Sequence, residues 1–486
     1  MNIHSNKIIN TQIIIFVLFL VVLSLGQMAR WDLLQQIAMS DRYSLLGNLY
    51  PDTGLSIPTG VSAYFPGVSV IALIIKNIVP NNLLIYSMHL IAVLVILSFF
   101  IVQRRITYSI SKDVNLDNFY IGAIFFSLIF CKFYLMYAVE FKPDTIAFLL
   151  GSLGIIIAKV DNNAGVDNNT SIKILPFVLG ASLTGCALIF KQQYIAFLVG
   201  MIIYSLVGKN YKFQIFTALS IIFSLLILYI FSTEENLFFW TVTILSDDGF
   251  VPIKYWVLNH ASLMIHTAQS IIVLFGLHLY GYVKIDFFAS FFSRKHLLMT
   301  PWPILIFMSA FAAFASSWKV GGNPGNTQLG LILLFPLIYF LIQKFDKRLL
   351  ILIVWVTFLS LLKPMINSVE QFQDSTALNQ AASSLVSDSK TKVLTGSDVY
   401  GAARMVKTLN PIHDLWTIER LTKTNLTNKL DPTPVIDSNI LSSLLADQDY
   451  DLVILENLPN YIKPLSSSSL YSIRFHNNLG IIAVRN

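Results

Sequence analysis

The residues of this chain best suited to chemistry are carboxylates and lysines at the ends of long apolar runs. Asp32 follows the first apolar run, and Asp144 opens a later run directly after Lys142 and Pro143. Lys191 stands at the turn between two further runs. A carboxylate can take a proton from a hydroxyl group, and a lysine can stabilise a leaving phosphate. The pattern therefore indicates group transfer at the border of an apolar layer.

The composition shows what kind of layer this is. The chain has 486 residues, 55% hydrophobic and 12% charged, whereas soluble domains carry about 25% charged residues. We therefore predict a mainly α, polytopic membrane protein with about eleven spans. The apolar runs cover residues 8–28, 83–102, 119–138, 145–158, 174–190, 194–207, 213–231, 261–283, 301–318, 328–342 and 349–362. The net charge of +6 lies mostly in short loops, where it sets orientation and does not indicate nucleic acid.

One further apolar run, residues 61–79, decides the topology. We interpret it as a helix lying on the outer membrane surface, because Pro66-Gly67 stands near its start and Lys76 within it. The basic loops around Arg104 and those that follow then share the cytoplasmic side with Lys7, as the positive-inside rule requires. This arrangement puts the N-terminus in the cytoplasm and the C-terminal tail outside a plasma (inner) membrane.

The composition changes near Lys363-Pro364. We expect a transmembrane module over residues 1–365, with an outer loop at 29–82, and a soluble, extracytoplasmic α/β domain over residues 366–486. Short apolar segments predict strands at 392–394 and 451–455 and a helix at 440–445. Two more strands, 470–475 and 480–484, flank the turn residues Asn477-Asn478 and predict a hairpin.

Five short motifs over residues 8–342 resemble the GT-C glycosyltransferases, in particular the bacterial relatives of protein O-mannosyltransferases and of the aminoarabinose–lipid A transferase (glycosyltransferase family 39-like). In chain order they are Asp32 with Ala38, Gly47, Tyr50 and Pro51; Tyr64-x-Pro66-Gly67; Lys142-Pro143-Asp144; Phe190-Lys191-Gln192-Gln193; and Lys319-x-Gly321-Gly322-Asn323. The resemblance implies a GT-C fold and a sugar donor carried on a polyprenyl phosphate.

The same resemblance assigns roles. Asp32 matches the carboxylate that acts as base or orients the acceptor, Asp144 matches a second carboxylate near that centre, and Lys191 matches a lysine on the carrier phosphate. We also expect substrate contacts from Arg30, Tyr64, Lys142, Lys319 and Asn323. Several relatives carry a second acid where this chain has Leu33, so no metal ligand is assigned and a divalent cation is left open.

The expected reaction transfers the sugar to a hydroxyl of a lipid, glycan or protein by a single displacement with inversion. Two alternatives stay open, namely a transporter or flippase of lipid-linked sugars and a glycan polymerase or ligase. The same residues also suit purely structural roles. Asp144 suits the start of a helix, and the lysines suit interfacial anchors.

Overall fold

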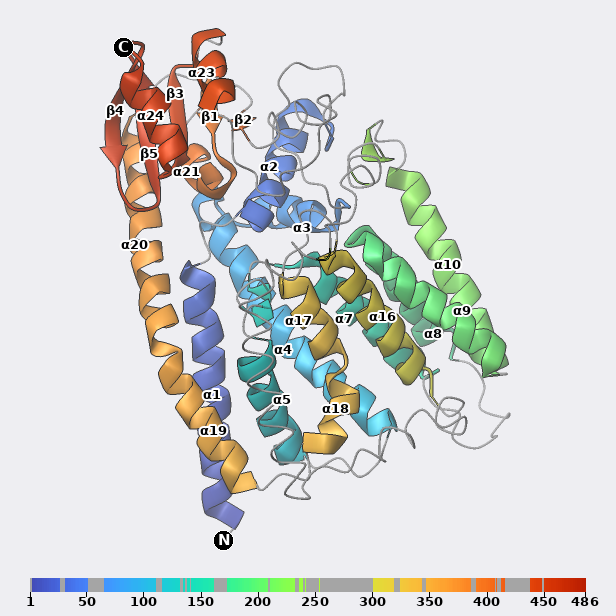
Figure 1. Ribbon diagram of the computed structural model, residues 1–486. Coiled ribbons are helices and arrows are strands. Elements are labelled where there is room, and N and C mark those ends of the chain that lie inside the picture. Colours follow the sequence, from blue (N-terminus) through green and yellow to red (C-terminus); the bar gives the residue numbers. More distant parts are fainter. Residues whose placement is uncertain are drawn as a thin grey trace.

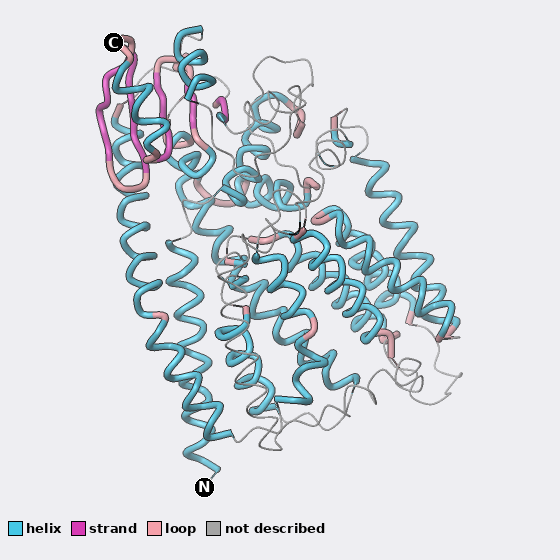
Figure 2. The backbone as a smooth tube through the Cα atoms, in the orientation of Figure 1, coloured by secondary structure: helices cyan, strands magenta, loops and turns pink. Residues whose placement is uncertain are grey.

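The computed structural model describes the chain outside residues 1, 27–30, 51–64, 111–115, 132–133, 136–137, 140, 161–172, 209, 232–235, 239–240, 242–252, 254–299, 319–323, 343–346, 386–389, 407, 409–411, 416–437 and 448–449. For several more residues, Asp32 among them, it describes the backbone alone. Helices form most of the described fold, and strands occur at one end (Figure 2).

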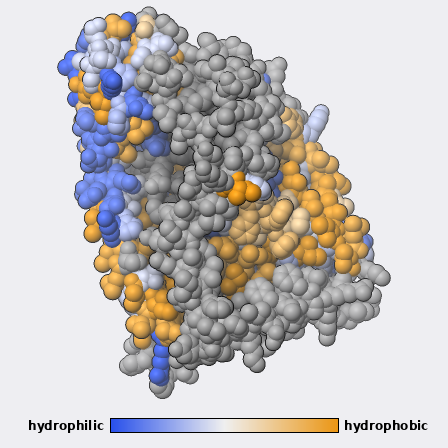
Figure 3. Space-filling model, viewed as in Figure 1, coloured by the Kyte–Doolittle hydropathy of each residue, from blue (hydrophilic) through white to orange (hydrophobic). Residues whose placement is uncertain are grey.

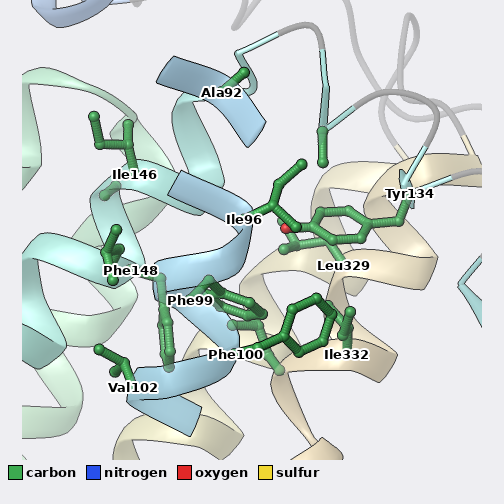
Figure 4. Packing of buried hydrophobic residues seen from close by; sticks show 14 of the residues in the cluster. Ala92, Ile96, Phe99, Phe100, Val102, Tyr134, Ile146, Phe148, Leu329 and Ile332 are labelled. Carbon is green, nitrogen blue, oxygen red and sulfur yellow. The ribbon is translucent and has the colours of Figure 1, made fainter. Parts of the chain in front are cut away.

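Helices that run side by side make up the body of the molecule (Figure 1). They are α1 (Asn2–Gly26), α4 (Leu84–Ile110), α5 (Leu116–Phe130), α7 (Pro143–Ala158), α8 (Ile174–Cys186), α9 (Ile195–Val207), α10 (Tyr211–Phe231), α16 (Trp302–Ser317), α17 (Pro324–Leu333), α18 (Phe335–Ile342), α19 (Lys347–Ser360) and α20 (Leu362–Ser384). Helix α4 is central, because its buried face packs against α1, α5, α7 and α18. Figure 4 shows Phe99 of α4 beside Phe148 of α7, with Ile332 of α17 nearby.

The described surface of this body is widely apolar. Along α10, Leu225 and Tyr229 are 61% and 73% exposed, and along α19 Leu352 and Leu359 are 60% and 67% exposed. Figure 3 shows hydrophobic residues over the lower body and hydrophilic ones over α20 and the strands. Because contiguous apolar surface of this kind marks contact with a membrane or a partner, the body is suited to a lipid environment.

Three described stretches are long and apolar enough to cross a membrane: Asn81–Ile110, Tyr211–Phe231 and Lys347–Ser384. The other apolar helices among the described residues are shorter. The number of spans therefore stays a prediction, and the expected span at 261–283 lies outside the described residues.

Two further helices cover one end of the body: α2 (Trp31–Leu46) and α3 (Gly67–Lys76). Helix α3 lies across the ends of the body helices in Figure 1. Its 10 residues span about 15 Å, half of the hydrocarbon thickness of about 30 Å. This length excludes a crossing by α3, while its place at a membrane interface stays a prediction.

Three predicted runs show the largest differences from the structure. Helix α4 continues to Ile110, beyond the expected end at residue 102. The run 328–342 is divided between α17 and α18, next to Pro336, which lacks the N–H that a continuous helix needs. The run 119–138 ends as helix α5 at Phe130. Beyond it, the Tyr134 N–H donates to Gln328 Oε1 at 2.7 Å, so a side chain of α17 replaces the helical acceptor.

The strands form one sheet in the order β2-β1-β3-β5-β4. They are β1 (Val393–Thr395), β2 (His413–Asp414), β3 (Leu452–Glu456), β4 (Tyr471–His476) and β5 (Gly480–Arg485). Strands β1, β2 and β3 are parallel, and β3-β5 and β5-β4 are antiparallel. The predicted strands and hairpin are thus confirmed. The two-residue β2 is an addition, because so short a strand has no detectable periodicity.

Helices cover both faces of the sheet. Helices α23 (Ser438–Asp447) and α24 (Pro459–Ser467) bury one face through Leu441 and Leu465. Helices α20 and α21 (Tyr400–Ala403) bury the other face through Leu378 and Ala402. Helix α20 begins at Leu362 beside α1 and ends at the sheet, so one continuous helix links the sheet to the bundle.

Helices α7 and α8 approach closely through glycines. A Cβ on Gly154 would collide with Thr184 Oγ1 and with the carbonyl oxygen of Gly180. Small residues allow this approach in a membrane, where packing takes the place of the hydrophobic effect between helices. The contact fixes α7, which carries Asp144 in its first turn, against α8, which leads to Lys191.

This contact predicts a destabilising glycine substitution. Gly154→Ala should lower the free energy of unfolding by about 1–3 kcal/mol, because the added methyl group meets backbone and a buried hydroxyl. Thermal unfolding in detergent measures the effect. Gly200→Ala in α9 is the matched control, since its Cβ would meet a flexible leucine end at 3.1 Å. Equal melting temperatures for the two variants would contradict the prediction.

Candidate active site

The predicted residues Asp144 and Lys191 meet at one end of the bundle. Lys191 Nζ lies 3.3 Å from Asp144 Oδ2, and the two side chains are 7% and 11% exposed. They come from the start of α7 and from the turn between α8 and α9. An ion pair so poorly hydrated is costly unless its geometry is good. Such a cost is expected where the charges themselves take part in function. The buried pair therefore marks this end of the bundle as a candidate site.

The backbone before α7 holds this carboxylate in place. Phe141 has a φ of 62°, a left-handed conformation that is rare for a residue with a Cβ. Lys142 is then extended, as a residue before proline prefers, and α7 begins at Pro143. Asp144 therefore lies in the first turn, where the helix dipole favours a negative charge. Lys142 is itself 8% exposed, so a second cation is buried beside this turn.

The turn that carries Lys191 also contacts α3. A Cβ on Gly67 would lie 2.7 Å from Phe190 Cδ1 and 2.9 Å from the carbonyl oxygen of Ile189. Only a glycine permits helix α3 to start so close to this turn. The Pro66-Gly67 and Phe190-Lys191 motifs, far apart in sequence, are thus in direct contact.

Helix α2 is fixed to α3 in turn. Ser69 Oγ donates a hydrogen bond to Gln36 Oε1 at 2.7 Å, and Lys76 Nζ lies 2.7 Å from Asp41 Oδ1. Asp32 lies one helical turn before Gln36, in the first turn of α2. Packing therefore links the helix that carries Asp32, through α3, to the turn that carries Lys191.

The other expected contacts fall where the structure gives no description. Of Asp32 the backbone alone is described, and Arg30, Tyr64, Lys319 and Asn323 lie outside the described residues. Their roles stay predictions. The question of a divalent cation also stays open.

A charged cluster that the sequence did not single out joins α2 to the C-terminal part of the chain. Both Asp41 oxygens are engaged, because Arg404 pairs with this carboxylate through Nε and also through Nη2, at 3.3 Å from Oδ1. Tyr400 Oη donates to Asp41 Oδ2 at 3.2 Å, and Lys76 approaches from α3. The partners are up to 363 residues apart in sequence, so no local motif announces them.

The neighbouring charges set the protonation states of Asp41 and Arg404. Burial by itself would raise the pKa of Asp41, but Arg404 and Lys76 outweigh it and hold that pKa below the usual value. Burial likewise opposes the charge on Arg404, and Asp41 raises the pKa of this guanidinium above its usual value. Both groups are charged at neutral pH, and each neutralises the other.

Two crystal structures of ArnT from Cupriavidus metallidurans, an aminoarabinose–lipid A transferase of the GT-C fold, are similar to this chain over nearly its whole length. The structure bound to undecaprenyl phosphate has 12% sequence identity, a TM-score of 0.55 and 97% coverage of both chains. The apo structure has 10% identity, a TM-score of 0.56 and 98% coverage of both chains. The chain has a GT-C fold.

The expected fold is thus confirmed. At this low sequence identity, the similarity shows the fold and nothing further. The GT-C fold here combines the helical bundle with the small C-terminal sheet, and the similarity extends over both. No protein-family model and no curated protein sequence matches the chain.

The Asp41 cluster predicts a pH-dependent stability difference. Because its native pKa is lowered, ionised Asp41 stabilises the fold above the unfolded-state pKa, and this contribution is lost as the pH falls through the native pKa. At pH 7, Asp41→Asn should therefore unfold at a lower temperature, with a loss of about 3 kcal/mol. The difference from wild type should shrink in acid.

Thermal unfolding in detergent between neutral pH and pH values below the usual carboxyl pKa of 3.8 measures this difference. Glu370→Gln on α20 is the control, since this carboxylate is exposed and surface charges contribute little. A constant gap between wild type and Asp41→Asn at every pH would refute the ionic contribution.

Proposed function

We propose that this protein is an integral membrane glycosyltransferase that moves a sugar from a polyprenyl-phosphate carrier to a hydroxyl group of a lipid, glycan or protein acceptor. The observation that carries the proposal is the buried Asp144–Lys191 pair at one end of the bundle. The GT-C fold supports it, because a structure with this fold is bound to undecaprenyl phosphate.

The chemistry follows from the charges. The acceptor oxygen attacks the anomeric carbon while its proton passes to Asp32, the proposed base. The bond between that carbon and the phosphate oxygen breaks, and the lipid phosphate leaves with the electron pair. One displacement inverts the anomeric centre. The base should contribute a rate factor of about a hundred to ten thousand.

Lysines stabilise the leaving group in this scheme. As the bond breaks, negative charge grows on the phosphate, and Lys191 and Lys142 supply buried positive charge at the same end of the bundle. Asp144 orients Lys191 through their ion pair. Arg30, Tyr64, Lys319 and Asn323 are proposed to complete the contacts with the two substrates.

The reaction is proposed to occur at the outer face of the plasma membrane. The apolar helices fit a membrane protein, and the positive-inside rule places the basic loops in the cytoplasm. In this orientation α2, α3 and the C-terminal sheet are extracytoplasmic.

The role of Asp32 is tested by sugar transfer. Purified protein receives undecaprenyl phosphate carrying a labelled sugar, from a panel of sugars, together with membrane-extract acceptors. Asp32→Asn should lower kcat by about a hundredfold or more, because the acceptor then keeps its proton. Full activity of this variant would refute Asp32 as the base. Movement of the donor across vesicles without bond cleavage would refute the transferase function.

The role of Lys191 is tested with the same donor. Lys191→Ala should lower kcat strongly, since the phosphate loses a buried cation, whereas Lys191→Arg should retain part of the activity. Lys173→Ala is the matched control, because Lys173 is exposed at the opposite end of α8. Equal activities for Lys191→Ala and Lys173→Ala would contradict the assignment.

The orientation has its own test. Ser469 and Arg105 are both exposed, and we expect them on opposite sides of the membrane. In a Cys186→Ser background, a membrane-impermeant maleimide added to spheroplasts should label Ser469→Cys and spare Arg105→Cys until the membrane is permeabilised. The reverse pattern would invert the proposed topology.

A further inference from the structure

The segment that carries Asp32 is anchored at both ends by the C-terminal part of the chain. Before it, Gly26 at the end of α1 packs directly on Ser368 of α20. After it, Asp41 of α2 pairs with Arg404, which follows α21. Residues 26 and 41 thus bracket Asp32, and both contact residues beyond 360. The C-terminal part is therefore placed to control the position of α2.

Arg404 makes the most specific of these contacts. Its guanidinium engages both Asp41 oxygens and also donates through Nη1 to the Asn81 carbonyl oxygen at 3.4 Å. The side chain is 5% exposed. A planar, bidentate pair fixes orientation as well as distance, which an apolar contact or a lysine does not. Lys76 adds a single charged contact to Asp41 from α3.

Apolar packing brings α21 onto the same helix. A Cβ on Gly401 would meet Ile85 Cδ1 at 3.4 Å and Leu34 Cδ2 at 3.8 Å. Leu34 lies two residues after Asp32 on α2. An alanine fits at position 401 in ordinary van der Waals contact, whereas a large side chain must push α21 away from α2.

We propose that Arg404 is a positioning residue for sugar transfer, which holds α2 through Asp41 and thereby fixes the place of Asp32. This inference rests on the proposed function, in which Asp32 is the base. It assigns the C-terminal part of the chain a role in the reaction itself. Asp41 lies nine residues after Asp32, about 13 Å along the helix, so a tilt of α2 about this anchor displaces the base.

The experiment uses the full-length protein in detergent or nanodiscs with four variants: Arg404→Gln, Arg404→Lys, Gly401→Trp and Gly401→Ala. The first measurement is amide hydrogen exchange in peptides from α2, which needs no substrate. The second is kcat and the KM for the labelled undecaprenyl-phosphate sugar. Circular dichroism and size-exclusion elution show that each variant is folded.

Arg404→Gln should speed exchange in α2 and lower kcat by about a hundredfold, the cost of misplacing a catalytic group by about 1 Å. The donor KM should stay unchanged, because the residues proposed to bind phosphate are untouched. Arg404→Lys should restore part of kcat, since it keeps the charge and loses the bidentate geometry. Gly401→Trp should reproduce both effects and Gly401→Ala neither.

Two results would overturn the proposal: a wild-type kcat in folded Arg404→Gln and Gly401→Trp, or a fall in kcat with unchanged exchange in α2. A parallel rise in KM and fall in kcat across all four variants would also overturn it, since that indicates general damage. Failure of the proposed function gives a different result. The wild-type protein would then release no lipid phosphate from any labelled donor, while Arg404→Gln still loosened α2.

Discussion

Charges buried at the edge of an apolar bundle need partners, and this constraint organises the functional end of the molecule. Lys191 pairs with Asp144, and Arg404 and Lys76 pair with Asp41. Each pair joins segments that are distant in sequence, so the requirement for neutralisation also fixes how those segments meet. Intact pairs of this kind add little stability over apolar packing, but the loss of one partner leaves a buried charge unpaired and is costly, so the pairs hold their segments together. They therefore suit a site whose groups must be held at fixed positions.

The Asp144–Lys191 pair and the Asp41 cluster belong to one connected arrangement. The close contact of α7 with α8 holds the helix that carries Asp144 against the helix that leads to Lys191. Gly67 lets α3 rest on the turn that carries Lys191, and α3 holds α2 through Ser69 and Lys76. The Asp41 cluster then fastens α2 to the part of the chain beyond α20. A displacement of the sheet can thus be transmitted through these contacts to α2, the helix that carries Asp32.

The GT-C fold is the basis of the reaction that we propose for the residues in these contacts. A likeness over 97% of both chains at 12% identity shows that the arrangement of helices is kept while most side chains differ. The proposed transferase activity depends on the few polar groups that this arrangement gathers, and the surrounding apolar residues supply packing and lipid contact. The small sheet is continuous with the bundle through α20, so it belongs to the same working unit in our proposal.

The sequence alone determined the membrane class, most of the helical runs, the strands of the C-terminal sheet and the motifs with Asp144 and Lys191. These follow from local hydropathy, periodicity and turn residues, which neighbouring positions encode. Only the tertiary structure decided where α4 and α5 end, the division of the run at 328–342, and the Asp41–Arg404–Lys76 cluster. A proline beside a helix break leaves a local trace, but an ion pair across 363 residues leaves none. The two residues become partners only because long-range packing buries both side chains next to each other.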